Sequence, residues 1–158
     1  MTYAITDAIS GSQAIANTST VANHALGTIV RATDPTYGAG EFIYLKGVAA
    51  TAVGDAVVFD QYAGTTTRLA AGGKGTLAWA MSANVASQYG WYQISGAVVA
   101  TVAAAFAAAA DLYATATAGT IDDAVVVGDL IAGAVGVTAI GTPTATTAVL
   151  QIDRPSIT

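Results

Sequence analysis

The 158-residue chain carries few charges, 9% of its residues, with a formal net charge of −5, and is dominated by 37 Ala, 22 Thr and 17 Gly. Its length suits one domain with its own core, and its 54% of apolar residues excludes a disordered chain. Catalysis needs titratable or nucleophilic groups gathered in a pocket, and the chain has one His and no Cys. The composition therefore favours a protein that works by contact rather than an enzyme, and we expect no cofactor.

The distribution of charge and apolar residues argues against two classes of partner. The basic residues are scattered singly, whereas binding to nucleic acid needs a basic patch. The first residues lack the stretches of a secretory signal, and the most membrane-like run, residues 97–110, is shorter than the roughly 20 residues that span a bilayer. We expect neither a nucleic-acid partner nor a membrane partner.

Residues 1–24 differ from the rest of the chain. They are rich in Ser, Thr, Asn and Ala, with isolated apolar residues at Ile5, Ile9, Ile15 and Val21. We expect an extended N-terminal arm that is ordered by the surface on which it lies, followed by a single β-rich domain over residues 25–158. The spacing of the three isoleucines leaves a weak helix in the arm as an alternative.

The body of the chain is typical of an all-β fold. Val and Ile together number 27 against 7 Leu, and glycines separate short β-branched runs at intervals of about ten residues. This pattern predicts a jelly roll or a small β-barrel or sandwich. The predicted strands are residues 26–32, 41–46, 55–60, 67–70, 76–82, 91–95, 97–102, 112–117, 129–132, 134–139 and 148–153.

Two further patterns bear on the fold. Seven of residues 101–110 are Ala, and this segment has the highest helix propensity of the chain, so we expect at most one short helix there, anchored by Phe106. The triplet Val53-Gly54-Asp55 recurs as Val127-Gly128-Asp129. Each triplet predicts a turn that starts a strand, and reuse of such a turn is a simpler explanation than duplication.

The candidates for chemistry are few. The only imidazole, His24, has no nucleophile or carboxylate near it in sequence, so surface or interface packing is expected. Residues 72–76 contain Gly-Gly-Lys-Gly-Thr but lack the P-loop spacing, which predicts a hairpin loop. Asp122, Asp123 and Asp129 do not follow a calcium-loop pattern. We therefore expect no metal site, with incidental cation binding between subunits left open.

Four segments, taken in order, carry a resemblance to a known family. They are residues 26–32, 37–47, 89–96 (Tyr-Gly-Trp-Tyr-Gln-Ile-Ser-Gly) and 119–135. Their order resembles the capsid decoration, or cement, proteins of tailed bacteriophages, and the likeness covers roughly residues 24–154. It implies a β-rich protein on the outer surface of the virion that bridges neighbouring major capsid proteins at local symmetry axes. It also implies association with other copies of itself, as a dimer or trimer, and transfers no catalytic residue.

The function expected on this basis is to cement the capsid and stabilise it against the pressure of its DNA. Modest contacts at many identical sites combine through effective concentration. The candidate contacts are the apolar residues of the arm and the aromatic cluster, although aromatic residues are also the obvious core fillers in a chain so poor in Leu. These candidates are Tyr3, Ile5, Ile9, Ile15, Val21, Tyr89 and Trp91.

Two other classes of protein remain as alternatives. A fibre, tail or surface-array subunit has a similar composition, but such proteins usually show clear sequence repeats. A ligand-binding β-barrel or an enzyme needs polar groups that converge in a cavity. The scarcity of His, Glu, Arg and Lys in this chain argues against the latter class.

Overall fold

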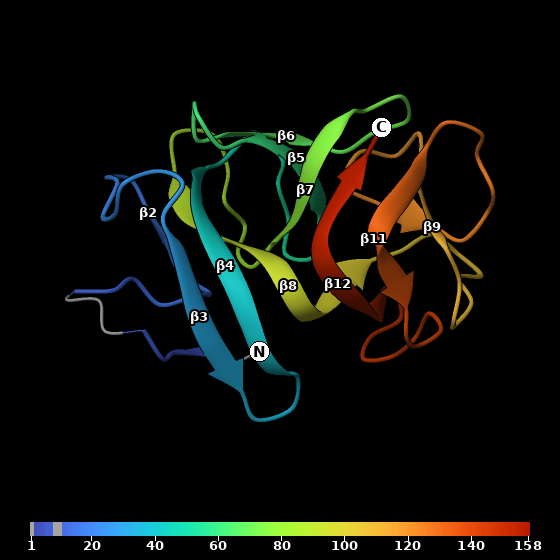
Figure 1. The fold of residues 1–158 in the computed structure, drawn as a ribbon, viewed down its shortest axis with the longest axis horizontal. Coiled ribbons are helices and arrows are strands. Elements are labelled where there is room, and N and C mark those ends of the chain that lie inside the picture. Colours follow the sequence, from blue (N-terminus) through green and yellow to red (C-terminus); the bar gives the residue numbers. More distant parts are fainter. Residues whose placement is uncertain (1, 8–10) are drawn as a thin grey trace.

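The computed structural model describes residues 2–7 and 11–158, and these residues form an all-β fold (Figure 1). The expected fold class is confirmed: twelve strands occur in the described residues, which contain no helix and so no helix able to cross a membrane. The strands are β1 (Ala4–Ile5), β2 (Thr18–Ser19), β3 (Ile29–Asp34), β4 (Gly38–Lys46), β5 (Ala56–Asp60), β6 (Thr65–Arg68), β7 (Gly75–Ala80), β8 (Tyr89–Thr101), β9 (Leu112–Ala114), β10 (Ile121–Asp122), β11 (Leu130–Gly136) and β12 (Thr147–Ile157).

The strands join in one mixed sheet. Their order is β1-β3-β4-β6-β5-β7-β8-β12-β11-β9-β10, with β2 paired to β8 and further pairings between β4 and β8 and between β7 and β12. Strands β4, β6, β5, β7 and β8 thus form a partial ring, in which β4 meets β6 through one parallel pair, Lys46 with Thr65. Each end of the sheet is a strand of two residues, and such short edges discourage pairing with other chains.

The longest strand, β8, connects the two halves of the sheet. Its first half pairs with β4 and its second half with β12. Figure 1 shows β8 between β3 and β4 on one side and β12, β11 and β9 on the other. The strand bends at Gly96, whose φ is +103°. A Cβ atom at Gly96 would lie 2.5 Å from the carbonyl oxygen of Ala39, so only glycine fits this crossing.

Two hydrophobic clusters lie on opposite faces of the central strands. The larger one contains the fully buried Phe42, Tyr44, Trp79 and Trp91. The smaller one draws two alternate residues from each of four ring strands, so it fills the interior of the ring. Its members are Ile43, Leu45, Val57, Phe59, Ala78, Ala80, Tyr92 and Ile94. Strands β4 and β8 are therefore buried on both faces, and large aromatic side chains provide much of the volume that a Leu-rich core would supply.

Most predicted strands are present with shifted ends, but two pairs of predicted strands are each one continuous strand. Residues 91–95 and 97–101 lie in β8, which ends one residue before the prediction, and residues 129–132 and 134–139 lie in or directly beside β11. The prediction divided each of these two strands at a glycine, β8 at Gly96 and β11 at Gly133. In the structure Gly96 bends its strand and Gly133, with φ +78°, accompanies a register shift against β12, while the hydrogen-bonded ladders continue.

Residues 101–110 form two turns after the end of β8 instead of the short helix allowed by their composition. Ala105 and Ala109 have positive φ, at 68° and 56°, which a right-handed helix does not permit. The backbone bonds to other segments: Ile140 N–H donates to the carbonyl of Phe106 at 3.0 Å. Phe106 is 1% exposed, so it anchors the segment as expected, but in a loop. Tertiary hydrogen bonds and burial outweigh the helix propensity of Ala.

Both Val-Gly-Asp triplets form the expected turns. Gly54 and Gly128 have φ of +87° and +88°, and the turns lead into β5 and β11. In each, the aspartate is buried and its backbone N–H donates three residues back, to Ala52 or to Val126. The repeated motif is therefore one turn used twice.

We predict that Gly96→Ala destabilises the protein much more than Gly72→Ala. Both glycines have positive φ, which costs an alanine about 1–2 kcal/mol, but only the new methyl group at Gly96 meets backbone atoms. Crowding adds roughly 1–3 kcal/mol at Gly96, whereas nothing lies within 4 Å at Gly72. Urea unfolding of the two variants measures the difference, and equal losses would contradict the crossing constraint.

Candidate contact surfaces

The described residues bring few reactive groups together. Across residues 2–7 and 11–158, no cluster of three or more His, Cys, Asp or Glu could hold a metal ion. Burial and the adjacent Asp123 carboxyl raise the pKa of Asp122. Two of the aspartates considered in the sequence bind separate backbone segments. Asp123 accepts a hydrogen bond from the backbone N–H of Ala107, and Asp129 accepts one from the backbone N–H of Gly72. Their contacts are those of turn-stabilising residues.

The first part of the arm, residues 2–7, extends the sheet beyond β3. Ala4 and Ile5 pair with Thr33 and Ala32, and Thr2 donates its backbone N–H to Asp34 Oδ2 at 2.6 Å. Burial would raise the pKa of Asp34, but backbone hydrogen bonds, including that from Thr2, outweigh it and lower the pKa. This segment is thus fixed to the protein's own sheet.

Tyr3 anchors the same segment to β8. Its ring packs against Phe42 at a centroid distance of 4.8 Å, and its hydroxyl donates to the carbonyl of Ala97 at 2.9 Å. Burial raises the pKa of Tyr3 to about 12, so the hydroxyl stays protonated and keeps this bond through the neutral range.

The second part of the arm is held by Gln13, which is 8% exposed. Its side-chain oxygen accepts hydrogen bonds from Tyr44, Ser19 and Asn23, all at 2.9 Å. Its side-chain nitrogen donates to the carbonyls of Asn17 and Tyr89, at 2.7 and 3.2 Å. One polar side chain therefore satisfies several buried groups and fastens residues 13–23 to β4 and β8.

His24 belongs to the same cluster. Its Nε2 accepts the backbone N–H of Gln13 at 3.0 Å, and its ring lies 5.0 Å from Tyr44 and 5.3 Å from Trp91. The backbone carbonyl of Gln13 accepts the indole N–H of Trp91 at 2.9 Å. The imidazole thus contacts Gln13 within the arm and Tyr44 and Trp91 in the body, so it serves packing and arm attachment.

The structure distributes the seven predicted contact residues between interior and surface. Ile15 and Trp91 are 2% and 0% exposed and lie in the larger core cluster, so they offer no side chain to a partner. This corrects their assignment as contacts: the core is short of large side chains and uses these two. Tyr3, Ile5 and Tyr89 are half-buried and pack against that cluster. Val21 is 71% exposed, and Ile9 lies outside the described residues.

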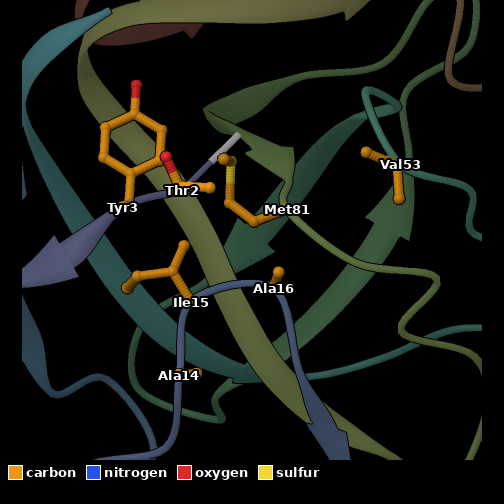
Figure 2. Close-up of a pocket in the computed structure, with 7 residues that line it drawn as sticks. All are labelled: Thr2, Tyr3, Ala14, Ile15, Ala16, Val53 and Met81. Atoms are coloured by element: carbon orange, nitrogen blue, oxygen red, sulfur yellow. The ribbon is translucent and has the colours of Figure 1, made fainter. Parts of the chain in front are cut away.

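A hollow of about 420 Å³ lies between the arm and the body (Figure 2). Tyr3, Ile15 and Met81 surround it, and Val53 lies at its far side. Thr2, Ala14 and Ala16 complete the lining, which contains no charged side chain. The hydroxyl of Tyr3 is already bonded to Ala97, so the described residues that line the hollow do not provide the convergent polar groups of a catalytic or ligand site.

Two exposed apolar surfaces were not predicted as contacts, apart from Val21. We define the hairpin end as Val21, Leu26 and Tyr62, and the β11 face as Val125, Val126, Val127, Leu130, Val135 and Val137. In Figure 1, β2 and β3 lie at one end of the long axis and β9 and β11 at the other, so the two surfaces are far apart. The run of three valines, in a stretch without a predicted strand, was a sequence signal for the β11 face.

The β5–β6 turn at the hairpin end has a backbone held by hydrogen bonds. Tyr62, at the tip between β5 and β6, is fully exposed. The tip is held by Asp60, whose Oδ1 accepts the backbone N–H groups of Tyr62 and Ala63 at 2.8 and 3.1 Å. A Cβ atom on Gly64 would overlap the side chain of Leu26, which shows how closely the hairpin meets the loop before β3. An exposed aromatic residue on a fixed tip is suited to contact with a partner.

We predict that acid loosens residues 2–7 through Asp34. Because its folded-state pKa is lowered, the stabilisation from the carboxylate is complete above about pH 4 and is lost as the pH falls through the folded-state pKa. Hydrogen exchange at the Thr6 amide, which donates to Arg31, should accelerate beyond the intrinsic pH effect. Asp34→Asn should remove this response. Asp7→Asn is the control for the other carboxylate that bonds to β3, and it should retain the response.

We also predict that Gln13→Ala lowers the free energy of unfolding by about 2–3 kcal/mol, since it leaves several buried polar groups without partners. Gln151→Ala, at an exposed position on β12, should change it by no more than about 0.5 kcal/mol. Urea unfolding measures both, and a small effect at Gln13 would mean that the arm contributes little to stability.

Neither a scan against protein-family models nor searches of curated proteins and of solved structures found a match to this chain. Its function is therefore inferred from its own residues and geometry.

Proposed function

We propose that the chain is a capsid cement protein, which binds the outer surface of a tailed-bacteriophage head and bridges neighbouring major capsid proteins. The observation that carries the proposal is the pair of exposed apolar surfaces at opposite ends of the molecule. A bridging protein needs two separated contacts on a body that does not deform between them. The composition, with its scarcity of reactive groups, supports contact over catalysis.

In this proposal the hairpin end supplies one of the two contacts with the shell. Tyr62 and Val21 are the most exposed large apolar side chains at that end, and the Asp60 turn holds the backbone at Tyr62 before any partner binds. A preformed contact loses less conformational entropy on binding than a flexible one. Many copies on one shell would then combine modest individual affinities.

The proposed role of the arm differs from the role expected from the sequence. An arm that becomes ordered on the shell would keep its apolar residues free, but Ile15 lies in the core and Gln13 binds Tyr44 and Tyr89 of the same chain. Removal of residues 1–20 would expose the larger core cluster. The arm is therefore proposed to stabilise the body, and the hairpin end to supply one shell contact.

The experiment is sedimentation of DNA-filled heads with the wild-type chain and two variants. The wild-type chain should co-sediment at a fixed ratio to the coat protein. Tyr62→Ala should reduce its occupancy at least about fivefold, because truncation of a tyrosine at an interface hot spot costs about 1 kcal/mol or more. Tyr37→Ala, at a half-buried tyrosine on the β3–β4 hairpin, is the control and should bind normally.

Free wild-type protein with no association to heads would overturn the proposal. Assembly of the purified chain into filaments without heads would favour the fibre or tail subunit instead.

A further inference from the structure

His24 holds the second part of the arm through a contact that only a neutral imidazole can make. Its Nε2 accepts the backbone N–H of Gln13 at 3.0 Å, and a neutral ring has one nitrogen whose lone pair is free for such a bond. The protonated ring carries an N–H on both nitrogens, so no rotation of the side chain restores an acceptor. Protonation therefore sets two N–H groups against each other and breaks this contact.

The other contacts of the ring do not depend on its charge. His24 is half-buried, so protons from the solvent can reach it. Its ring lies 5.0 Å from that of Tyr44 and 5.3 Å from that of Trp91. Packing of one ring against another needs no lone pair. Loss of the bond to Gln13 therefore separates the arm from His24 and leaves the imidazole on the body.

Among the described residues, the charged groups around His24 give its protonated form no free carboxylate. Positions 8 to 30 contain no Asp, Glu, Lys or Arg, and β8 contains none either. On β4, Glu41 already forms ion pairs with two arginines, and Lys46 lies on the same side of the strand as Tyr44. A positive charge at Lys46 opposes a second one nearby. No ion pair thus compensates for the lost hydrogen bond.

The remaining titratable groups near the ring are a carboxylate and tyrosines. Asp60, in the turn that meets the arm's end at Leu26, already accepts two backbone N–H groups. Tyr44 donates its hydroxyl to the side chain of Gln13, and Tyr89 follows it on the facing strand β8. Imidazole is the one side-chain type of this set whose ordinary pKa places its change of charge between pH 5 and 8. A response in that range therefore reports the histidine.

The contact lies at the point where the arm reaches the body. Residues 11 and 12 are exposed, and Gln13 is the first buried residue after them. Its carbonyl accepts the indole N–H of Trp91 at 2.9 Å, and its side-chain bonds involve neutral groups. Those bonds persist in mild acid. Loss of the His24 contact therefore loosens residues 13–23 without unfolding the body.

We propose that His24 is a pH-sensitive switch: its neutral form holds residues 13–23 on the body, and its protonated form loosens them below about pH 6.5. In the bonded state the Gln13 N–H reaches His24 Nε2, and in the open state it does not. The open state binds a proton that the bonded state excludes, so its population rises as the pH falls. For one proton and an ordinary imidazole, the ratio of open to bonded molecules rises about tenfold between pH 7.5 and 5.5.

The two parts of the arm then respond to acid in different ranges. Asp34 holds residues 2–7, and backbone hydrogen bonds lower its pKa from 3.8, so that segment stays paired with β3 until the pH is well below the range of the imidazole. Between the two ranges, residues 13–23 are loosened while residues 2–7 remain attached. This inference goes beyond the proposed function and concerns the free chain.

The test is hydrogen exchange of the purified chain, with each rate corrected for the intrinsic effect of pH. In the wild-type chain the protection of the Gln13 amide should fall about tenfold between pH 7.5 and 5.5. That of the Asn17 amide, which donates to Ala14 in the same segment, should fall with it. The Thr6 amide, which donates to Arg31, should keep its protection over this range.

Two substitutions of His24 separate the switch from packing. His24→Gln supplies an amide oxygen that can accept the same N–H and does not titrate, so protection at Gln13 should be independent of pH. His24→Phe keeps a ring against Tyr44 and Trp91 but has no acceptor, so protection should be low at both pH values. Asp34→Asn is the control for the first part of the arm and should retain the tenfold response at Gln13.

Unchanged protection of Gln13 in the wild-type chain would overturn the inference, and this comparison needs no variant. An equal fall in His24→Gln would overturn it too, because the response would then come from another group. A parallel fall at Thr6 would show general loosening in place of a local switch. Since no heads are present, each of these results leaves the co-sedimentation test of the proposed function independent.

Discussion

The pairing of β8 with β4 on one side of Gly96 and with β12 on the other holds the two halves of the sheet together. A side chain at Gly96 would meet the backbone of β4, so the absence of a Cβ atom is what allows the strands to cross at that distance. Tyr44 of β4 is paired with Trp91 on the first half of β8, and the arm is attached to both through Gln13. The arm, both clusters and the β11 half therefore all depend on the course of one strand.

The scarcity of large aliphatic residues decides which side chains are free for contact. Ala contributes little buried area, so Phe42, Trp79, Trp91 and Phe106 are all needed inside. This explains why aromatic residues that are typical of interfaces lie in the core here. The apolar surface that remains exposed comes mainly from valines in turns and on β11, with Tyr62 as the exception at the other end.

The sequence predicted the all-β class and the position of most strands, because β-branched runs and glycines are local signals. It divided β8 and β11 at glycines, since a glycine that ends a strand and one that bends it look alike in sequence. The role of Gln13 was beyond prediction: its partners Tyr44 and Tyr89 lie 31 and 76 residues away. The burial of Trp91 depended on the same distant contacts, whereas the exposed valine run carried a usable local signal that was missed.

In the proposed function, force between the two bridged capsid proteins would pass along the hydrogen-bonded ladders of one sheet. The hairpin end is attached to β4 and β5, and the β11 face is attached to β12. Because β8 pairs with both β4 and β12, it is the strand that connects the two ends. Ladder hydrogen bonds resist sliding of neighbouring strands because many must break together. A core of small side chains then suffices, since the sheet, more than the volume of the core, keeps the two contacts at a fixed separation.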